Sequence, residues 1–246
     1  VELLLESLGS SGRHREATEF VSQLSETETG LLTPKAVDEA VSACTRCSSW
    51  ALALRVGRAH VLQGAEVHVR TVQRLLRAAG EAGDAEGAEQ LMRVLLERSG
   101  VGEAMSRSGT WHLRAQVRGG QLDRAVLSLL TMMEDIHSPP ALQAVYEVMD
   151  ASISSGDWQT AAYVESMLST LSRPGADGVA LHADPGVTER RLALAAGAGD
   201  VDHAMRLLQD HLSTGFPATG RLFELVIMAC LRAGDKATGR QLLEEM

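Results

Sequence analysis

The residues best suited to chemistry in this chain are arginines that gather in two neighbouring stretches. They are Arg70, Arg74, Arg77, Arg107, Arg114 and Arg118. A guanidinium group forks onto phosphate or carboxylate and stacks on flat rings, so these residues predict the binding of anions or bases. The chain as a whole carries a net charge of −9, which disfavours general binding of nucleic acid. Any such contact must therefore be local. The alternative is that these arginines only keep a surface soluble.

Other chemically capable residues do not form an active site in the sequence. The eight histidines are scattered; His203 and His211 could share a helix face, but they lack a third ligand, and we interpret the histidines as surface residues. Asp200 and Asp202 follow a turn, where carboxylates typically cap a helix rather than catalyse. We therefore expect no enzyme, no metal, no cofactor and no small-molecule substrate.

The three cysteines and the hydropathy bear on the redox compartment of the protein and on whether it enters a membrane. Cys44 and Cys47 form a C-x-x-C pair, but no second Cys or His pair lies near them, which favours packed thiols over a zinc or redox site. Cys230 holds a matching helical position and is also expected to pack. Three cysteines do not make a disulfide framework, which indicates a reducing compartment. No apolar run approaches the roughly 20 residues of a membrane span, so we expect no membrane insertion.

A repeated sequence motif predicts the helices that position the arginines. The motif consists of a turn residue and, five positions later, a small residue. Its instances are Gly12/Ala17, Ser48/Ala53, Gly83/Ala88, Gly120/Ala125, Gly156/Ala161, Gly199/Ala204 and Gly234/Gly239. The turns are 35 to 37 residues apart, except for one interval of 43. Self-similarity at this period predicts an all-α solenoid of stacked helix-turn-helix repeats, in which neighbouring units supply the core.

Each unit is expected to be two helices around its turn. In the third unit apolar residues recur at helical spacing on both sides of Gly83-Asp84. Glycine suits the left-handed residue that ends the first helix, and the Asp that follows it in four of the seven turns can cap the second helix. The small residue, Ala88 in this unit, is expected where the two helices cross closely.

Further positions agree when the turn residue is counted as position 15. Position 20 is Ala in six of the seven units and Gly239 in the last. Gly64 and Gly215 hold position 31, and Pro217 holds position 33. Position 27 is apolar in five of the seven units: Leu24, Leu95, Met132, Leu168 and Met246. In these features the chain resembles the pentatricopeptide repeat family, most clearly over residues 215–246. Position 8 is large and apolar where tetratricopeptide repeats place Gly, which favours the pentatricopeptide interpretation.

The resemblance implies a right-handed superhelix formed by one array over residues 1–246. Its expected repeats are 1–33 (partial), 34–68, 69–105, 106–141, 142–184, 185–219 and 220–246 (partial). Residues 171–184 contain Pro and Gly and are predicted to be an inserted loop, either a simple surface loop or a contact point. Since both terminal units are incomplete, we expect the chain to be a piece of a longer protein.

Charge is distributed unevenly over the expected helices. The first helices carry twelve basic and nine acidic residues, so their layer is positive although the chain is acidic. One helix layer of such a solenoid lines the concave surface, and the six arginines are densest in the first helices of the third and fourth units. They are the candidate RNA-binding residues.

In the family that the chain resembles, each repeat reads one RNA base through positions 5 and 35, with position 2 packing against the base. The corresponding pairs here are Asp38 with His68, Gln73 with Met105, Thr110 with Ala141, Tyr146 with Asp184, and Glu189 with Thr219. These pairs lack the usual Asn, Thr or Ser with Asp or Asn. We therefore expect contact with RNA that does not depend on sequence.

The resemblance implies an organelle, with the mitochondrion favoured over the plastid. We predict a non-enzymatic, RNA-associated structural component of an organellar ribonucleoprotein, such as an organellar ribosome, or a factor of RNA metabolism. Its partners would be ribosomal RNA or a transcript, together with protein subunits. The alternative is a scaffold subunit of a large organellar complex that binds proteins and does not contact RNA.

Overall fold

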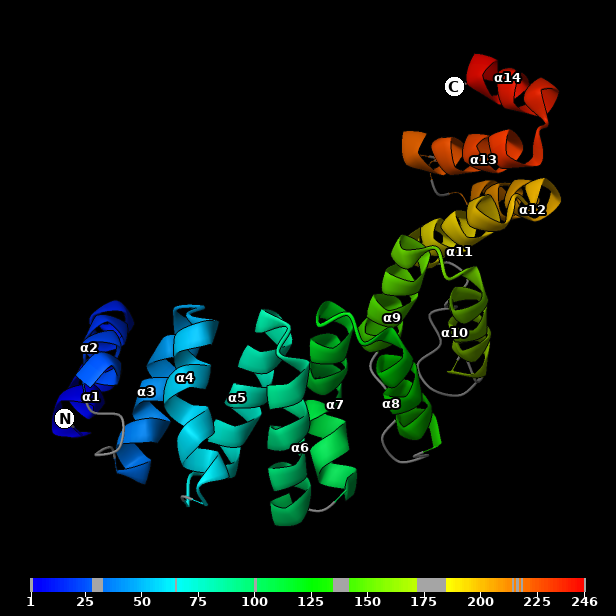
Figure 1. Cartoon of the computed structure of the whole chain (residues 1–246). Helices are drawn as coiled ribbons and strands as arrows, with labels where there is room; N and C mark the ends of the chain where they lie inside the picture. Colours follow the sequence, from blue (N-terminus) through cyan, green and yellow to red (C-terminus); the bar gives the residue numbers. More distant parts are fainter. Residues whose placement is uncertain are drawn as a thin grey trace. The chain divides into compact units, whose positions relative to one another are not determined.

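The computed structural model describes residues 2–27, 33–64, 66–99, 101–134, 142–171, 185–213, 215, 217 and 219–245. Within these ranges every regular element is an α-helix and no strand occurs (Figure 1). The prediction of an all-α repeat solenoid is confirmed. None of the described helices combines the length and the apolar character that crossing a bilayer requires.

The chain divides into two compact units, residues 1–144 and 145–246. In the first unit the helices are α1 Glu2–Ser10, α2 His14–Thr27, α3 Pro34–Arg46, α4 Trp50–Leu62, α5 Val69–Ala82, α6 Ala85–Ser99, α7 Val101–Arg118 and α8 Leu122–Glu134. The helices of the second unit are α9 Leu142–Ser155, which starts just before the boundary, α10 Trp158–Leu171, α11 Pro185–Ala198, α12 Val201–Ser213, α13 Gly220–Ala233 and α14 Lys236–Glu245.

Helices of the first unit form two layers. The first helices of successive hairpins contact one another in the order α1, α3, α5 and α7, and the second helices α2, α4 and α6 do the same beside them (Figure 1). Their apolar faces meet in one core, to which Val37, Leu75 and Leu91 contribute fully buried side chains. A shared core between repeats is what the period of the sequence predicts, because no single hairpin can bury its own apolar face.

The predicted turns all have the expected backbone. Glycine at these positions has φ between 69° and 77°, in the left-handed region that ends a helix without a Cβ clash. Ser48 takes the same place in the second hairpin with φ 56°, and within the described residues it is the only non-glycine residue with positive φ. The turn at Ser48 therefore carries strain that a glycine would not.

The small residue of each hairpin lies where it was predicted. All six alanines of the repeated phrase have an exposed fraction of 0%: Ala17, Ala53, Ala88, Ala125, Ala161 and Ala204. Gly239 is also buried, and a Cβ added to it would lie 3.4 Å from the Cβ of Cys230. The crossing of the paired helices thus leaves room for one methyl group at most, which explains the restriction to Ala and Gly.

Each Asp that follows a turn caps the next helix, as predicted. The Oδ1 atoms accept hydrogen bonds from backbone N–H groups three residues later at 2.8 to 3.2 Å; they belong to Asp84, Asp157, Asp200 and Asp235. Hydrogen bonds from Thr160 and Thr238 hold the pKa of Asp157 and of Asp235 below the ordinary value. Asp200 is thus a helix cap, which supports the structural interpretation of the pair with Asp202.

Several predictions on the organisation of the chain stay predictions. Apart from Leu171, the predicted insertion 171–184 lies outside the described residues. The single array over residues 1–246 and its right-handed superhelix depend on how the two units are placed together. They and the repeat boundaries stay predictions. Each unit taken by itself is a stack of helical hairpins.

Candidate nucleic-acid interface

Helix α5 presents the densest part of the arginine stripe. Its buried residues include Val72, Leu75 and Leu76, which anchor one face in the core. Arg70, Arg74 and Arg77 follow one another at intervals of four and three, so they share a different face of the same helix. The buried apolar face fixes the rotation of α5 and thereby directs the arginines outward.

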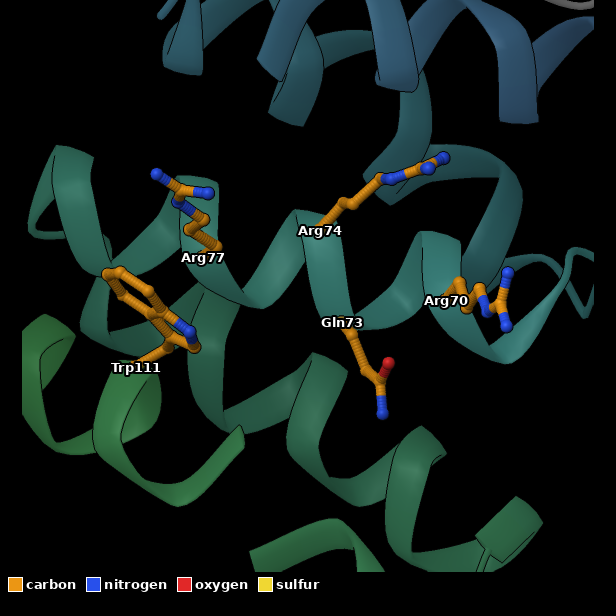
Figure 2. A pocket seen from close by; sticks show the side chains of 5 residues that line it. All are labelled: Arg70, Gln73, Arg74, Arg77 and Trp111. Atoms are coloured by element: carbon orange, nitrogen blue, oxygen red, sulfur yellow. The ribbon is translucent and has the colours of Figure 1, made fainter. Parts of the chain in front are cut away.

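These arginines line two adjoining cavities on the side of the first-helix layer. The first has a volume of about 350 Å³ and is lined by Arg70, Gln73, Arg74, Arg77 and Trp111 (Figure 2). The second has a volume of about 320 Å³ and is lined by Ser42, Thr45, Arg46, Ser48, Trp50, Arg74 and Arg77. Since Arg74 and Arg77 line both, the cavities form a continuous basic surface, which we call the α5 groove.

Two tryptophans hold Arg77 in the α5 groove. Its guanidinium carbon lies 5.5 Å from the ring centroid of Trp50 in α4 and 5.2 Å from that of Trp111 in α7. Figure 2 shows the Arg77 side chain beside the Trp111 ring. Cation–π contacts of this kind contribute about 0.5–1 kcal/mol each at exposed sites. They reduce the rotamers of Arg77 and so prepare it for a ligand.

The arginines of α7 differ from those of α5 because two of them pair with one carboxylate. Arg114 Nη1 and Arg118 Nη1 each lie 2.8 Å from a carboxylate oxygen of Glu81, which is at the end of α5. Arg114 also lies over Trp111, at 4.7 Å from the ring centroid. The side chain of Arg107 lies outside the described residues.

The structure therefore divides the predicted stripe into two groups. Among the described residues, Arg70, Arg74 and Arg77 form no ion pair with a carboxylate, whereas Arg114 and Arg118 share one. The first group keeps its full charge for a ligand. The second group joins α5 to α7 and adds less positive potential to the α5 groove.

The first helices of the second unit are more nearly neutral. Arg190 forms two hydrogen bonds of 2.8 Å with the carboxylate of Asp150 and lies 4.3 Å from the ring centroid of Tyr146. Arg221 lies 3.6 Å from an oxygen of Glu189 and 3.1 Å from one of Glu224. Carboxylates thus pair with Arg190 and Arg221 and reduce the positive charge that these two helices present.

Positions 5 and 35 of the repeats have different surroundings. Gln73 lines the first cavity of the α5 groove, and Tyr146 is buried beneath Arg190. Met105, Ala141 and Asp184 have side chains outside the described residues. Glu189 and Glu224 both pair with Arg221 at the surface, where their side chains are 50% and 60% exposed.

Sequence reasoning missed the tryptophans of the α5 groove. Trp50 follows the turn of the second hairpin in the sequence, and Trp111 lies three residues before Arg114, but neither spacing indicates that both rings approach Arg77. Both rings are partly buried, and an aromatic ring beside arginines can stack on a base while guanidinium groups hold the neighbouring phosphates. The α5 groove is therefore suited to binding a base together with its neighbouring phosphates.

Cysteines and histidines differ in how well their predictions agree with the structure. Cys44 and Cys230 are buried, and burial raises the pKa of the Cys44 thiol to about 11, as expected for a packed thiol.

The prediction of surface histidines is wrong for His112 and His211, whose exposed fractions are 7% and 5%. Both lie on helix faces that neighbouring elements cover. Within the described residues no three His, Cys, Asp or Glu side chains gather as a metal site would require.

Solved structures with a similar fold contain pentatricopeptide repeats. The pentatricopeptide repeat protein PPR10 from maize matches with a TM-score of 0.54, and PPR10 in complex with an 18-nt psaJ RNA element matches with 0.55. Each is 18% identical to this chain, and the match covers 100% of this chain and 38% of the other. The sequence matches no family model and no curated protein. The repeats described above are therefore pentatricopeptide-like in fold, as the sequence predicted.

Proposed function

We propose that this chain binds RNA through the α5 groove and is not an enzyme. The observation that carries the proposal is the set of three arginines on α5 that have no carboxylate partner among the described residues, beside two tryptophans. Guanidinium groups can contact phosphates, and indole rings can stack on bases. Proteins that bind single-stranded nucleic acid typically combine these two kinds of contact. The complex of PPR10 with RNA shows that a similar fold accommodates such a ligand.

The binding is proposed to depend weakly on base sequence. Arg70 and Arg74 can reach phosphates, which every RNA presents, whereas the positions that would read bases are buried, ion-paired or occupied by unsuited residues. A non-enzymatic role as a structural component of an organellar ribonucleoprotein, such as an organellar ribosome, or as a factor of RNA metabolism fits this pattern. We extend the proposal to a mitochondrial location, with the plastid as the alternative.

The test is a salt titration of RNA binding by the parent and by the double variant Arg70→Gln/Arg74→Gln. Fluorescence anisotropy with a labelled RNA of about 20 nucleotides gives the affinity at each salt concentration. Loss of two phosphate contacts should flatten the slope of log affinity against log salt by about 1.4. A fourfold rise in salt should then weaken the variant about sevenfold less than the parent.

A matched control is available on the other helix layer of the same unit. The double variant Arg93→Gln/Arg124→Gln removes the same charge from α6 and α8, and both side chains are exposed. It should retain the salt slope of the parent. Equal slopes for all three proteins would refute RNA binding through the α5 groove.

A further inference from the structure

A third cavity lies on the side of the second helices of the first unit, away from the α5 groove. It has a volume of about 440 Å³ and is lined by Glu89, Arg93, Gln116, Arg124, Leu127 and Ser128. Helices α6 and α8 both pack against α7, so α6 and α8 form its walls and the α7 residue Gln116 forms its floor. We call this cavity the α6–α8 groove.

The floor of the α6–α8 groove contains a polar side chain that lacks a partner. Gln116 is only 3% exposed, and its Oε1 atom is buried without a hydrogen bond. Its Nε2 atom lies 3.4 Å from Nε2 of His112, and the same histidine nitrogen lies 3.1 Å from Glu89 Oε2. Burial lowers the pKa of His112 despite the nearby Glu89, so the ring is neutral near pH 7 and offers a single N–H.

The single N–H of His112 cannot supply all the hydrogen bonds that Glu89 and the Gln116 carboxamide require. Turning that carboxamide would let its oxygen share the N–H with Glu89, but its two N–H groups would then lack acceptors. In either orientation Gln116 keeps a buried polar atom without a hydrogen-bond partner. A buried polar group without a partner is costly, so its place in the floor of a cavity points to a ligand.

The charges of the walls define the chemistry of that ligand. Arg93 and Arg124 stand on opposite walls, and neither forms an ion pair with the described carboxylates; Arg124 has only a 3.3 Å hydrogen bond to Gln121. No aromatic ring lines the cavity to stack on a base, so the α6–α8 groove lacks the tryptophans that suit the α5 groove to RNA. Leu127 is 63% exposed at the rim, which suits an apolar side chain.

We propose that the α6–α8 groove binds an acidic, extended segment of a partner protein. A side-chain carboxylate lies between Arg93 and Arg124, and a backbone amide of the segment satisfies Gln116. A peptide backbone offers both an N–H and a C=O, so it suits either orientation of the carboxamide. This chain would then hold RNA on its first-helix side and a protein on its second-helix side. The two sites share no lining residue.

The experiment uses an array of extended peptides of about ten residues that carry two Asp or Glu residues each, with matched peptides that carry Asn or Gln instead. The acidic set should bind the parent about tenfold more tightly than its amide counterpart. Arg93→Gln/Arg124→Gln should abolish that preference, whereas Arg70→Gln/Arg74→Gln should preserve it. The preference for acidic peptides over amide peptides should therefore not depend on RNA binding.

A second variant tests the role of Gln116 separately from the fold. Gln116→Met replaces the carboxamide with an apolar side chain of similar size, so it should unfold at the same or a higher temperature than the parent while binding the acidic peptides more weakly. In the parent, the side-chain amide signals of Gln116 in NMR spectra should shift on addition of an acidic peptide.

Three outcomes would overturn the proposal. One is equal binding of the acidic and amide peptides by the parent. Another is acidic-peptide binding that Arg93→Gln/Arg124→Gln leaves unchanged. The third is an RNA oligonucleotide that shifts the Gln116 amide signals and loses this effect in Arg93→Gln/Arg124→Gln, because the groove would then be a nucleic-acid site.

Discussion

Glu81 offers the sharpest test of how the arginines of the first unit are divided. It ends α5 and accepts hydrogen bonds at 2.8 Å from both Arg114 and Arg118 of α7. Arg118 also donates to the backbone oxygen of Glu81 at 2.8 Å. The variant Glu81→Gln keeps the size of the side chain and removes the negative charge that pairs with the two guanidinium groups. It should lower stability and increase RNA binding at once.

The loss of stability can be bounded from the exposure of the partners. The side chains of Arg114 and Glu81 are 16% and 20% exposed, whereas Arg118 is 47% exposed. An exposed ion pair contributes at most about 1 kcal/mol, and breaking a fully buried pair costs about 3–5 kcal/mol. Glu81 lies between these cases, so Glu81→Gln should cost about 1–3 kcal/mol in urea unfolding. The melting temperature should fall by several degrees.

The gain in RNA binding follows from the same two arginines. Releasing both from Glu81 makes up to two more guanidinium groups available for phosphates. The salt slope of binding should therefore steepen by up to about 1.4 for single-stranded RNA. The matched control is Glu97→Gln, because Glu97 is exposed on α6 and makes no ion pair among the described residues. It removes the same charge far from the α5 groove.

Two results would refute this reasoning. If Glu81→Gln were as stable as the parent, the ion pairs of Glu81 with Arg114 and Arg118 would contribute nothing to the stability of the fold. If the variant were less stable but had the same salt slope as Glu97→Gln, Arg114 and Arg118 would not belong to the RNA interface. The candidate site would then shrink to the arginines of α5.

Two further predictions concern the fold. Ser48→Gly should stabilise the protein by about 1 kcal/mol, because it relieves the left-handed backbone of a residue with φ 56°; an unchanged or lower melting temperature would argue against strain at this turn. Burial lowers the pKa of His112 below its ordinary value of 6.5, so on acidification the unfolded chain binds the proton before the folded chain does. The free energy of unfolding should therefore fall as the pH drops from 6.5 towards the lowered pKa, by at most about 1.4 kcal/mol per pH unit. Urea unfolding between about pH 7.5 and 5.5 should show a smaller fall for His112→Gln than for the parent, whereas parallel curves would contradict the assignment.

The sequence by itself determined the repeat, its register and the ends of most helices. The turn glycines, the buried alanines such as Ala88, and caps such as Asp84 are all where the repeated phrase predicts them. These features depend on local backbone conformation and on a period that seven units repeat. Interactions within a few residues decide them, so they can be predicted without knowing how the chain packs.

Only the tertiary structure decided which arginines of the stripe are free. Arg77 meets Trp50 and Trp111 from two other helices, and Glu81 of α5 neutralises Arg114 of α7, which lies 33 positions further along the chain. The unpartnered carboxamide of Gln116 likewise becomes visible only when α6 and α8 are packed on α7. Charge and burial at these positions depend on side-chain contacts between repeats, and a one-dimensional pattern of residue types does not specify which side chains meet.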